Sequence, residues 1–254
     1  MLKLLRRFFF RPIPEIPAEL WARTEARLPF LDALSRDERM RVRELARAFL
    51  ASKQFHGARD FELNNEMLLS IALQAVLPVY RLGLSAYRGW VGIIIYSGDI
   101  VIPRSEMDEY GIVHEFDDEV LGEARADGPV LLSWPAADRE EDGVNVVIHE
   151  FAHKLDMAHG GADGLPPLPS DMSRREWARD FNEAYEALCC AIALGEPTML
   201  DPYAAEDPAE FFAVSAEAFF ETPLELRAAH PRVHAQLARL FGLDPAANLD
   251  ENCN

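Results

Sequence analysis

Apolar residues recur with helical spacing near the start of the chain and again throughout its second half. Ser35 lies three residues before Glu38, ahead of apolar positions spaced along residues 40–50, which is the pattern of a capping box that opens an amphipathic helix. A second helix is expected over residues 65–77, because Pro78 cannot donate a hydrogen bond inside a helix. The pattern therefore places two helices before any strand.

Short apolar runs in the middle of the chain predict strands. Residues 91–96 and 100–102 flank the turn residues 97–99, so we expect two short strands joined tightly. Residues 129–134 form a further strand after an acidic stretch. This strand has two interpretations: an edge on which an extended peptide pairs, or an interior strand buried by its apolar side chains.

Helical spacing returns in the second half of the chain, where we expect helices over residues 144–157 and 173–192. Gly242 is expected to end the last of the later helices. Those helices are expected to begin at residues that favour a first turn: Asp207, Pro223 and Pro231. Strands grouped between helical regions, without a repeated strand–helix–strand alternation, predict an α+β domain with a small sheet.

The chain is expected to form one main domain with two appended segments. Residues 1–30 are basic and rich in proline, and residues 12–30 are expected to form an irregular arm laid against the body. One domain follows over residues 31–245, with a polar tail at residues 246–254. The length of 254 residues, with 49% hydrophobic and 27% charged side chains, is typical of a globular protein with a substantial core.

The charge distribution argues against some partners. The chain carries 25 Lys and Arg against 43 Asp and Glu, a net charge of -18. Residues 1–60 are net positive, whereas the rest of the chain is strongly acidic. Direct binding to nucleic acid or to an anionic membrane is therefore not expected.

The apolar segments and the cysteines favour a cytoplasmic protein. The phenylalanine run at residues 8–10 is shorter than the ~7–15 apolar residues of a signal peptide. The longest apolar region, residues 67–84, is interrupted by polar residues and proline, and falls short of the ~20 apolar residues that span a bilayer. Cys189 and Cys190 are adjacent and Cys253 lies in the polar tail, so no disulfide framework can be drawn.

The segment that most strongly indicates a catalytic site contains the pattern His149-Glu150-x-x-His153. Two histidines four residues apart in a helix lie about 40° apart around its axis, so both imidazoles can reach one metal ion. Glu150 lies beside them, where it can hold a water on the metal and accept its proton. The surrounding residues are apolar, so the helix should be buried, and a metal ion would supply the partner that its polar groups need.

Three side chains are candidates for the third metal ligand. Asp156 follows His153 on the same helix face, where it suits a hydrogen-bond acceptor for a histidine N–H better than a ligand. His159 completes the metzincin spacing, although those enzymes have glycine at the position of Asp156. Glu210 lies in a second apolar helix, and a carboxylate from there would complete a site of two histidines and one glutamate with one open position.

Glu210 and Glu217 each also have a simpler explanation. Asp207, Pro208 and Glu210 form an N-terminal capping arrangement, so Glu210 is also explained as a cap of its own helix. Glu217 lies seven residues further along the same helix face, where it either orients a metal ligand or remains a solvated carboxylate. The residues alone leave these alternatives open.

Two motifs together resemble those of a known family. The segment HEFAHKLD at residues 149–156, combined with YAAEDPAEFFA at residues 203–213, is similar to the Mlc titration factor A family of zinc metallopeptidases. The catalytic core of that family is similar to that of anthrax lethal factor. The resemblance covers most of the chain, and it implies a mostly helical, zincin-like α+β domain with a small mixed sheet and an HExxH active-site helix.

The resemblance also implies roles and activities. His149, His153 and Glu210 would bind one zinc ion, Glu150 would act as the catalytic base, and Tyr203 would assist at the developing oxyanion. The implied activity is aminopeptidase-like hydrolysis of short peptides. The family also implies binding to Mlc, a glucose-responsive transcriptional repressor, and through it regulation of the sugar phosphotransferase system.

Two alternative functions remain at this stage. The chain could be a non-catalytic protein that sequesters a repressor and holds a structural zinc ion, or a metzincin-like peptidase in which His159 is the third ligand. Glu150 argues against the first alternative, because a structural site needs ligands but no general base between them.

Overall fold

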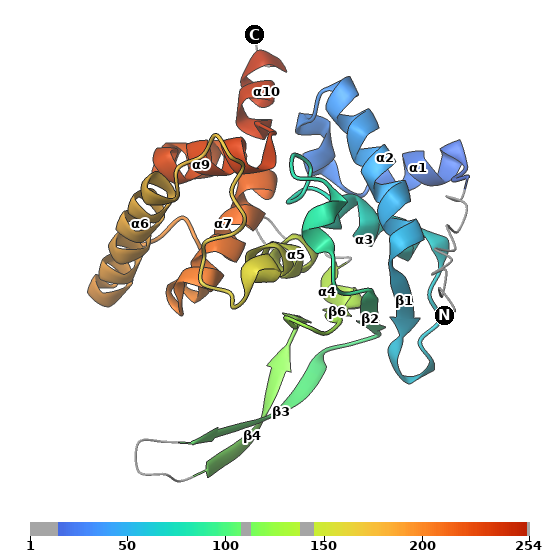
Figure 1. Cartoon of the computed structure of the whole chain (residues 1–254), viewed down its shortest axis with the longest axis horizontal. Coiled ribbons are helices and arrows are strands. Elements are labelled where there is room, and N and C mark those ends of the chain that lie inside the picture. Colours follow the sequence, from blue (N-terminus) through green and yellow to red (C-terminus); the bar gives the residue numbers. More distant parts are fainter. Residues whose placement is uncertain (1–14, 108–112, 138–144, 253–254) are drawn as a thin grey trace, which may run out of the picture.

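The computed structural model describes residues 15–107, 113–137 and 145–252 of the chain (Figure 1). α5 (Val146–Asp156) lies between the N-terminal and the C-terminal helices and packs against a small sheet. The N-terminal helices are α1 (Ala18–Glu25), α2 (Arg36–Ser52) and α3 (Asn65–Ala75). The later helices are α4 (Trp134–Ala137), α6 (Arg174–Leu194), α7 (Pro208–Glu221), α8 (Pro223–Ala229), α9 (Pro231–Phe241) and α10 (Pro245–Asn252).

The main sheet has four strands in the order β1 (Gln54–Gly57), β2 (Gly92–Tyr96), β6 (Val130–Ser133) and β5 (Gly122–Ala124). The first three strands are parallel, and β5 runs antiparallel to β6 at one edge. The expected α+β fold, mostly helical with a small mixed sheet, is therefore confirmed. β6 is an interior strand and all its residues are buried, so the edge interpretation of residues 129–134 is wrong.

The expected tight pairing of residues 91–96 with 100–102 is also wrong. β2 belongs to the main sheet, whereas β3 (Ile100–Met107) pairs with β4 (Val113–Val120) in a separate two-stranded sheet that projects from the body (Figure 1). β2 is apolar on both faces, which suits an interior strand of a parallel sheet better than a hairpin. Ile100 and Ile102 instead pack on Leu131 and anchor the base of the β3–β4 arm.

Local signals predicted most helix ends correctly. Ser35 and Glu38 form the expected capping box at α2, and the Ser173 side chain caps α6. α8 and α9 begin at the expected prolines, and Gly242 ends α9 in the left-handed conformation with φ 71°.

The N-terminal segment differs from the irregular arm that the prolines predict. It contains α1, and Trp21 and Leu28 are buried in the core. Pro17 lies at the N-cap of α1, where its missing N–H removes no hydrogen bond of the helix. Residues 1–14, including the phenylalanine run at 8–10, lie outside the described residues. The segment expected as a polar tail includes α10, in which Ala246 is buried.

α5 and α7 are buried on nearly all sides and form the centre of the hydrophobic core. The two helices pack against each other, with phenylalanines of α7 filling the space towards α6 and α9. Polar side chains on either helix therefore require partners. Within the described ranges, none of the helices is long and apolar enough to cross a membrane.

Candidate metal centre

Asn145 fixes the start of the helix that carries both histidines. Its side-chain oxygen accepts a hydrogen bond from the backbone N–H of Ile148 at 2.9 Å, as an N-cap residue does. Its side-chain nitrogen donates to Gln74 on α3 and to Glu221 on α7, each at 2.7 Å. The cap therefore joins three helices and sets where α5 begins.

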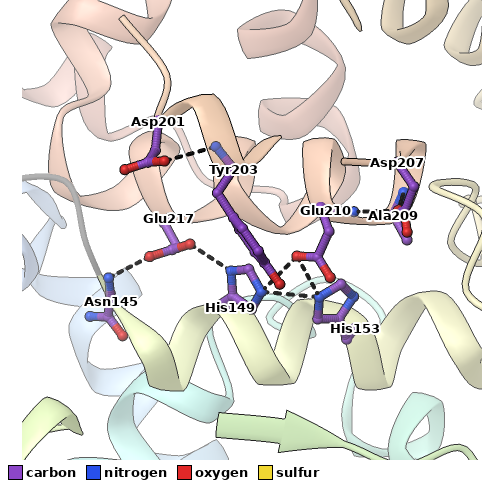
Figure 2. A network of polar contacts seen from close by, with 9 residues as sticks. All are labelled: Asn145, His149, His153, Asp201, Tyr203, Asp207, Ala209, Glu210 and Glu217. Carbon is purple, nitrogen blue, oxygen red and sulfur yellow. Dashed lines mark hydrogen bonds and ion pairs between the residues drawn. The ribbon is translucent and has the colours of Figure 1, made fainter. Parts of the chain in front are cut away.

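Asp207 performs the corresponding role for α7. Its carboxylate accepts hydrogen bonds from the backbone N–H groups of Ala209 at 2.7 Å and Glu210 at 3.0 Å. Because Asp207 caps the helix, the side chain of Glu210 is available for another role, and Figure 2 shows it pointing at the two histidines of α5.

Three ligand atoms converge between α5 and α7 (Figure 2). Glu210 Oε2 lies 3.1 Å from His149 Nε2 and 3.3 Å from His153 Nε2. The two Nε2 atoms are 3.0 Å apart. Ligands held tetrahedrally at about 2.0–2.1 Å from one ion are about 3.3–3.4 Å apart, so the three atoms are close to the spacing that a metal ion requires.

The competing third ligands lie elsewhere. His159 is exposed on the 3-10 turn after α5 and is not part of the converging group. Asp156 is buried, but its Oδ2 atom accepts hydrogen bonds from the backbone N–H groups of Asp163 at 3.0 Å and Gly164 at 2.8 Å. Asp156 Oδ1 and His153 Nδ1 are both buried without a hydrogen-bond partner among the described residues, so the expected hydrogen bond from a histidine to Asp156 is not formed.

Glu217 is the acceptor for the other nitrogen of His149. Its Oε1 atom lies 2.7 Å from His149 Nδ1, and its Oε2 atom accepts a hydrogen bond from the backbone N–H of Asn145. The Glu217 side chain is 6% exposed, so it is not a solvated carboxylate. A proton held on Nδ1 by Glu217 leaves Nε2 of His149 with a lone pair directed at the centre.

The electrostatics of the centre favour a cation. Burial opposes a charge on His149, but hydrogen bonds to Glu210 and Glu217 outweigh it and raise the pKa of His149 well above its usual value. Burial also acts to raise the pKa of Glu210, yet hydrogen bonds from His149 and His153 lower it overall. Burial raises the pKa of Glu150.

Tyr203 lies at the mouth of the centre. It sits on a 3-10 turn (Pro202–Ala205), where its backbone N–H donates to the Asp201 carboxylate at 2.8 Å. Its ring centroid is 6.1 Å from that of His149, and Figure 2 shows its hydroxyl pointing towards His149 and Glu210. Burial and the charges of Glu210 and Glu206 raise its pKa, so the hydroxyl keeps its proton and can donate a hydrogen bond.

Gly122 and Ala124, the two residues of β5 beside Glu150, were not predicted from the sequence. Glu150 is 5% exposed and its carboxylate lies against Gly122 of β5, where the backbone N–H of Ala124 favours its charged form. β5 has only three residues and therefore no periodic signal. Asn145 was also missed, although an asparagine directly before an apolar helix is a recognisable N-cap signal.

A mostly helical α+β domain whose buried HExxH helix faces a glutamate on a neighbouring helix has the architecture of the zincin-like metallopeptidase class. A sequence model of the glucose-regulated metallo-peptidase M90 family matches residues 6–242. The chain is 37% identical over 227 residues to Mlc titration factor A of Edwardsiella ictaluri, which covers 87% of each protein. It is 35% identical over 228 residues to Mlc titration factor A of Serratia proteamaculans, covering 87% of this chain and 86% of that protein.

A further relative is an uncharacterised protein of Synechocystis sp., 34% identical over 249 residues, with 96% of this chain and 89% of that protein covered. The chain belongs to the glucose-regulated metallo-peptidase M90 family. The family resemblance expected from the two sequence motifs is therefore confirmed.

Proposed function

We propose that this protein is a zinc-dependent peptidase with one zinc ion per chain. The observation that carries the proposal is the convergence of His149, His153 and Glu210 beside the buried carboxylate of Glu150. Two imidazole nitrogens and one carboxylate oxygen are a donor set that suits zinc and leaves one coordination position open.

The chain's own groups supply the proton transfers and the charge stabilisation. When bound, zinc would act as a Lewis acid that polarises the scissile carbonyl and makes water more acidic. Glu150 accepts a proton from the attacking water and delivers it to the leaving amine. Tyr203 donates its hydroxyl proton as a hydrogen bond to the oxygen that becomes negative.

The sheet edge beside Glu150 supports an extended peptide as the substrate. β5 is an edge strand of the main sheet, and a peptide can add to it as a further strand. β5 is short and is followed at once by the turn at residues 125–128, so only a short stretch of peptide can pair with it. Aminopeptidase-like action on short peptides is supported by the family resemblance, and the acidic body favours neutral or basic peptides.

A second activity, binding to an Mlc-like repressor, is supported by the names of the relatives. Two of them are called Mlc titration factor A and match along most of their length. The rival function is sequestration of a repressor without catalysis, around a structural zinc ion. The presence of Glu150 and the exposed Tyr203 at the mouth of the centre favour an enzyme. A cytoplasmic location remains a prediction from the cysteines and the apolar segments.

The test is cleavage of a mixed peptide library by the zinc-loaded protein, with products identified by mass spectrometry. Glu150→Gln is expected to retain zinc and lose cleavage, whereas Glu225→Gln, the same change at an exposed position on α8, is expected to keep both. Removal of single N-terminal residues supports aminopeptidase-like action, and internal cuts contradict it. Absence of cleavage by wild type, with repressor binding retained in Glu150→Gln, would favour the sequestration function.

A further inference from the structure

Among the described residues, β5 pairs with a strand on one side only, so its backbone groups face either β6 or the open edge. The backbone N–H of Ser133 donates to the carbonyl of Leu121 at 2.8 Å, and the N–H of Arg125 donates to the carbonyl of Pro129 at 3.4 Å. In an antiparallel ladder, alternate residues direct both of their polar groups to the same neighbour. Residues 121, 123 and 125 therefore face β6, and Gly122 and Ala124 face the open edge.

Glu150 reaches this open edge from α5. The backbone N–H of Ala124 is near enough to the Glu150 carboxylate to favour its charged form. Directly beside it, a Cβ atom at Gly122 would lie 2.6 Å from both Cγ and Oε1 of Glu150. That separation is shorter than real Cβ contacts, so the carboxylate occupies the space that any side chain at residue 122 would need.

The requirement for glycine at this position is spatial. Gly122 is not among the residues with positive φ, so its backbone conformation is open to any residue. Glycine weakens a strand interior because it has more conformational freedom to lose, and alanine would be favoured there if space allowed. The Glu150 side chain is the obstacle to alanine.

We propose that Gly122 is a positioning residue for the general base, and that β5 thereby sets the place of Glu150 relative to the peptide that pairs with the same strand. This inference rests on the proposed peptidase function. The bare backbone of Gly122 lets the Glu150 carboxylate remain at the Ala124 N–H. A methyl group at residue 122 displaces the carboxylate from that donor, and a displacement of about 1 Å in a reacting group costs on the order of 10²-fold in rate.

A double-mutant cycle on the metal-free protein tests the contact without any measurement of activity. Gly122→Ala is expected to lower the midpoint of thermal unfolding by several degrees in the presence of Glu150. In the Glu150→Ala background the same substitution is expected to be neutral or stabilising, because the obstructing atoms are gone. An equal loss in both backgrounds overturns the inference.

Activity and metal binding then separate a positioning role from a structural one. In Gly122→Ala, kcat is expected to fall by at least tenfold, KM to stay within about twofold, and the Co²⁺ absorption spectrum to match wild type, because the ligands are untouched. The control is Gly98→Ala, where a Cβ meets nothing within 4 Å, and it is expected to retain full kcat. If Gly122→Ala alone fails to fold, the double variant Gly122→Ala/Glu150→Asp is measured in its place. This double variant is expected to fold, because the shorter Asp side chain withdraws the carboxylate from residue 122.

The outcomes distinguish failure of this inference from failure of the proposed function. A wild type that cleaves peptides, beside a Gly122→Ala variant with unchanged kcat, overturns the positioning role and leaves the peptidase intact. A wild type that cleaves nothing, with the stability coupling still present, preserves the Gly122–Glu150 contact and overturns the peptidase proposal, and with it the catalytic meaning of the contact.

Discussion

Glu217 and Glu210 hold the imidazole ring of His149 from its two opposite nitrogens. Glu217 Oε1 lies 2.7 Å from Nδ1, and Glu210 Oε2 lies 3.1 Å from Nε2. Both carboxylates come from α7, seven residues apart, and so from the same face of one helix. The rigid helix therefore fixes the orientation of the ring as well as supplying a candidate ligand.

Glu217→Gln is expected to weaken zinc affinity by about 10–100-fold, the usual effect of losing a partner of a metal-binding histidine. An amide can still accept from His149, but its NH₂ group would face the backbone N–H of Asn145, which is also a donor. Competition with a chelator measures the change. Glu183→Gln on exposed α6 surface is the control, and equal affinity in both variants would contradict the role of Glu217.

Zinc is expected to raise the thermal midpoint of the metal-free protein through the ligands of the centre. At a free zinc concentration 100 times the dissociation constant the stabilisation is about 2.7 kcal/mol, or about 5–10 °C for a chain of this size. Glu210→Gln is expected to lose most of this shift, and His159→Ala is expected to keep it. The reverse result would favour the metzincin-like ligand set.

Tyr203→Phe is expected to lower kcat by about 10²–10³-fold with little change in zinc content or unfolding midpoint. The residue is 46% exposed, so its hydroxyl contributes little to the core. Steady-state kinetics on the best library peptide measures the effect. A variant with wild-type kcat would remove Tyr203 from the mechanism.

Gly164 ties the end of α5 to the start of α7. It has φ 77°, its N–H is held by Asp156, and a Cβ there would lie 2.5 Å from the carbonyl oxygen of Pro208. Gly195, with φ 70°, has nothing within 4 Å of the same position, so Gly195→Ala measures the backbone strain alone, about 1–2 kcal/mol. Gly164→Ala is expected to lower the free energy of unfolding by a further ~1–3 kcal/mol because of the clash with Pro208. Urea unfolding measures both variants. Equal costs would show that the contact with Pro208 relaxes freely.

The stability of the protein is expected to rise with pH between about 7 and 10 because of Lys53. Its Nζ atom is buried 3.4 Å from the centroid of the Trp90 ring and donates hydrogen bonds to the carbonyls of Tyr87 and Trp90. Burial and the charge of Lys154 lower its pKa from 10.5 to about 7. In that window the unfolded chain binds more protons than the folded one, so raising the pH favours folding.

Urea midpoints across this pH range measure the effect, and Lys53→Met is expected to show a shallower rise than wild type. Some rise remains, because burial also lowers the pKa of Lys154 to about 8. An unchanged slope in Lys53→Met would show that the Lys53 amine is charged in the folded protein above pH 7.

Features encoded by neighbouring residues were predictable from the sequence. The capping box of α2, the helices that carry His149 and Glu210, and the ends of α8 and α9 all follow from spacing within one or two turns. The family resemblance then selected Glu210 from three candidates, and its carboxylate does lie at the two histidines.

Features that depend on distant pairing were not predictable in the same way. β4 is rich in acidic residues and shows no apolar pattern, and it becomes a strand only because β3 lies beside it. The hydrogen bonds of Asp156 depend on a loop that returns seven and eight residues later, which helical geometry cannot anticipate. Gly122 lies 28 positions before Glu150, and only the folded sheet brings them together.

The helices that carry the candidate ligands are also the most deeply packed parts of the described chain. Their backbone amides can exchange hydrogen with solvent only when the core itself opens. An ion held between α5 and α7 would therefore slow exchange across both helices together, and its loss would make opening of the core, and with it digestion by a protease, more frequent. The resistance of the protein to proteases would in this way report whether the centre between α5 and α7 holds an ion.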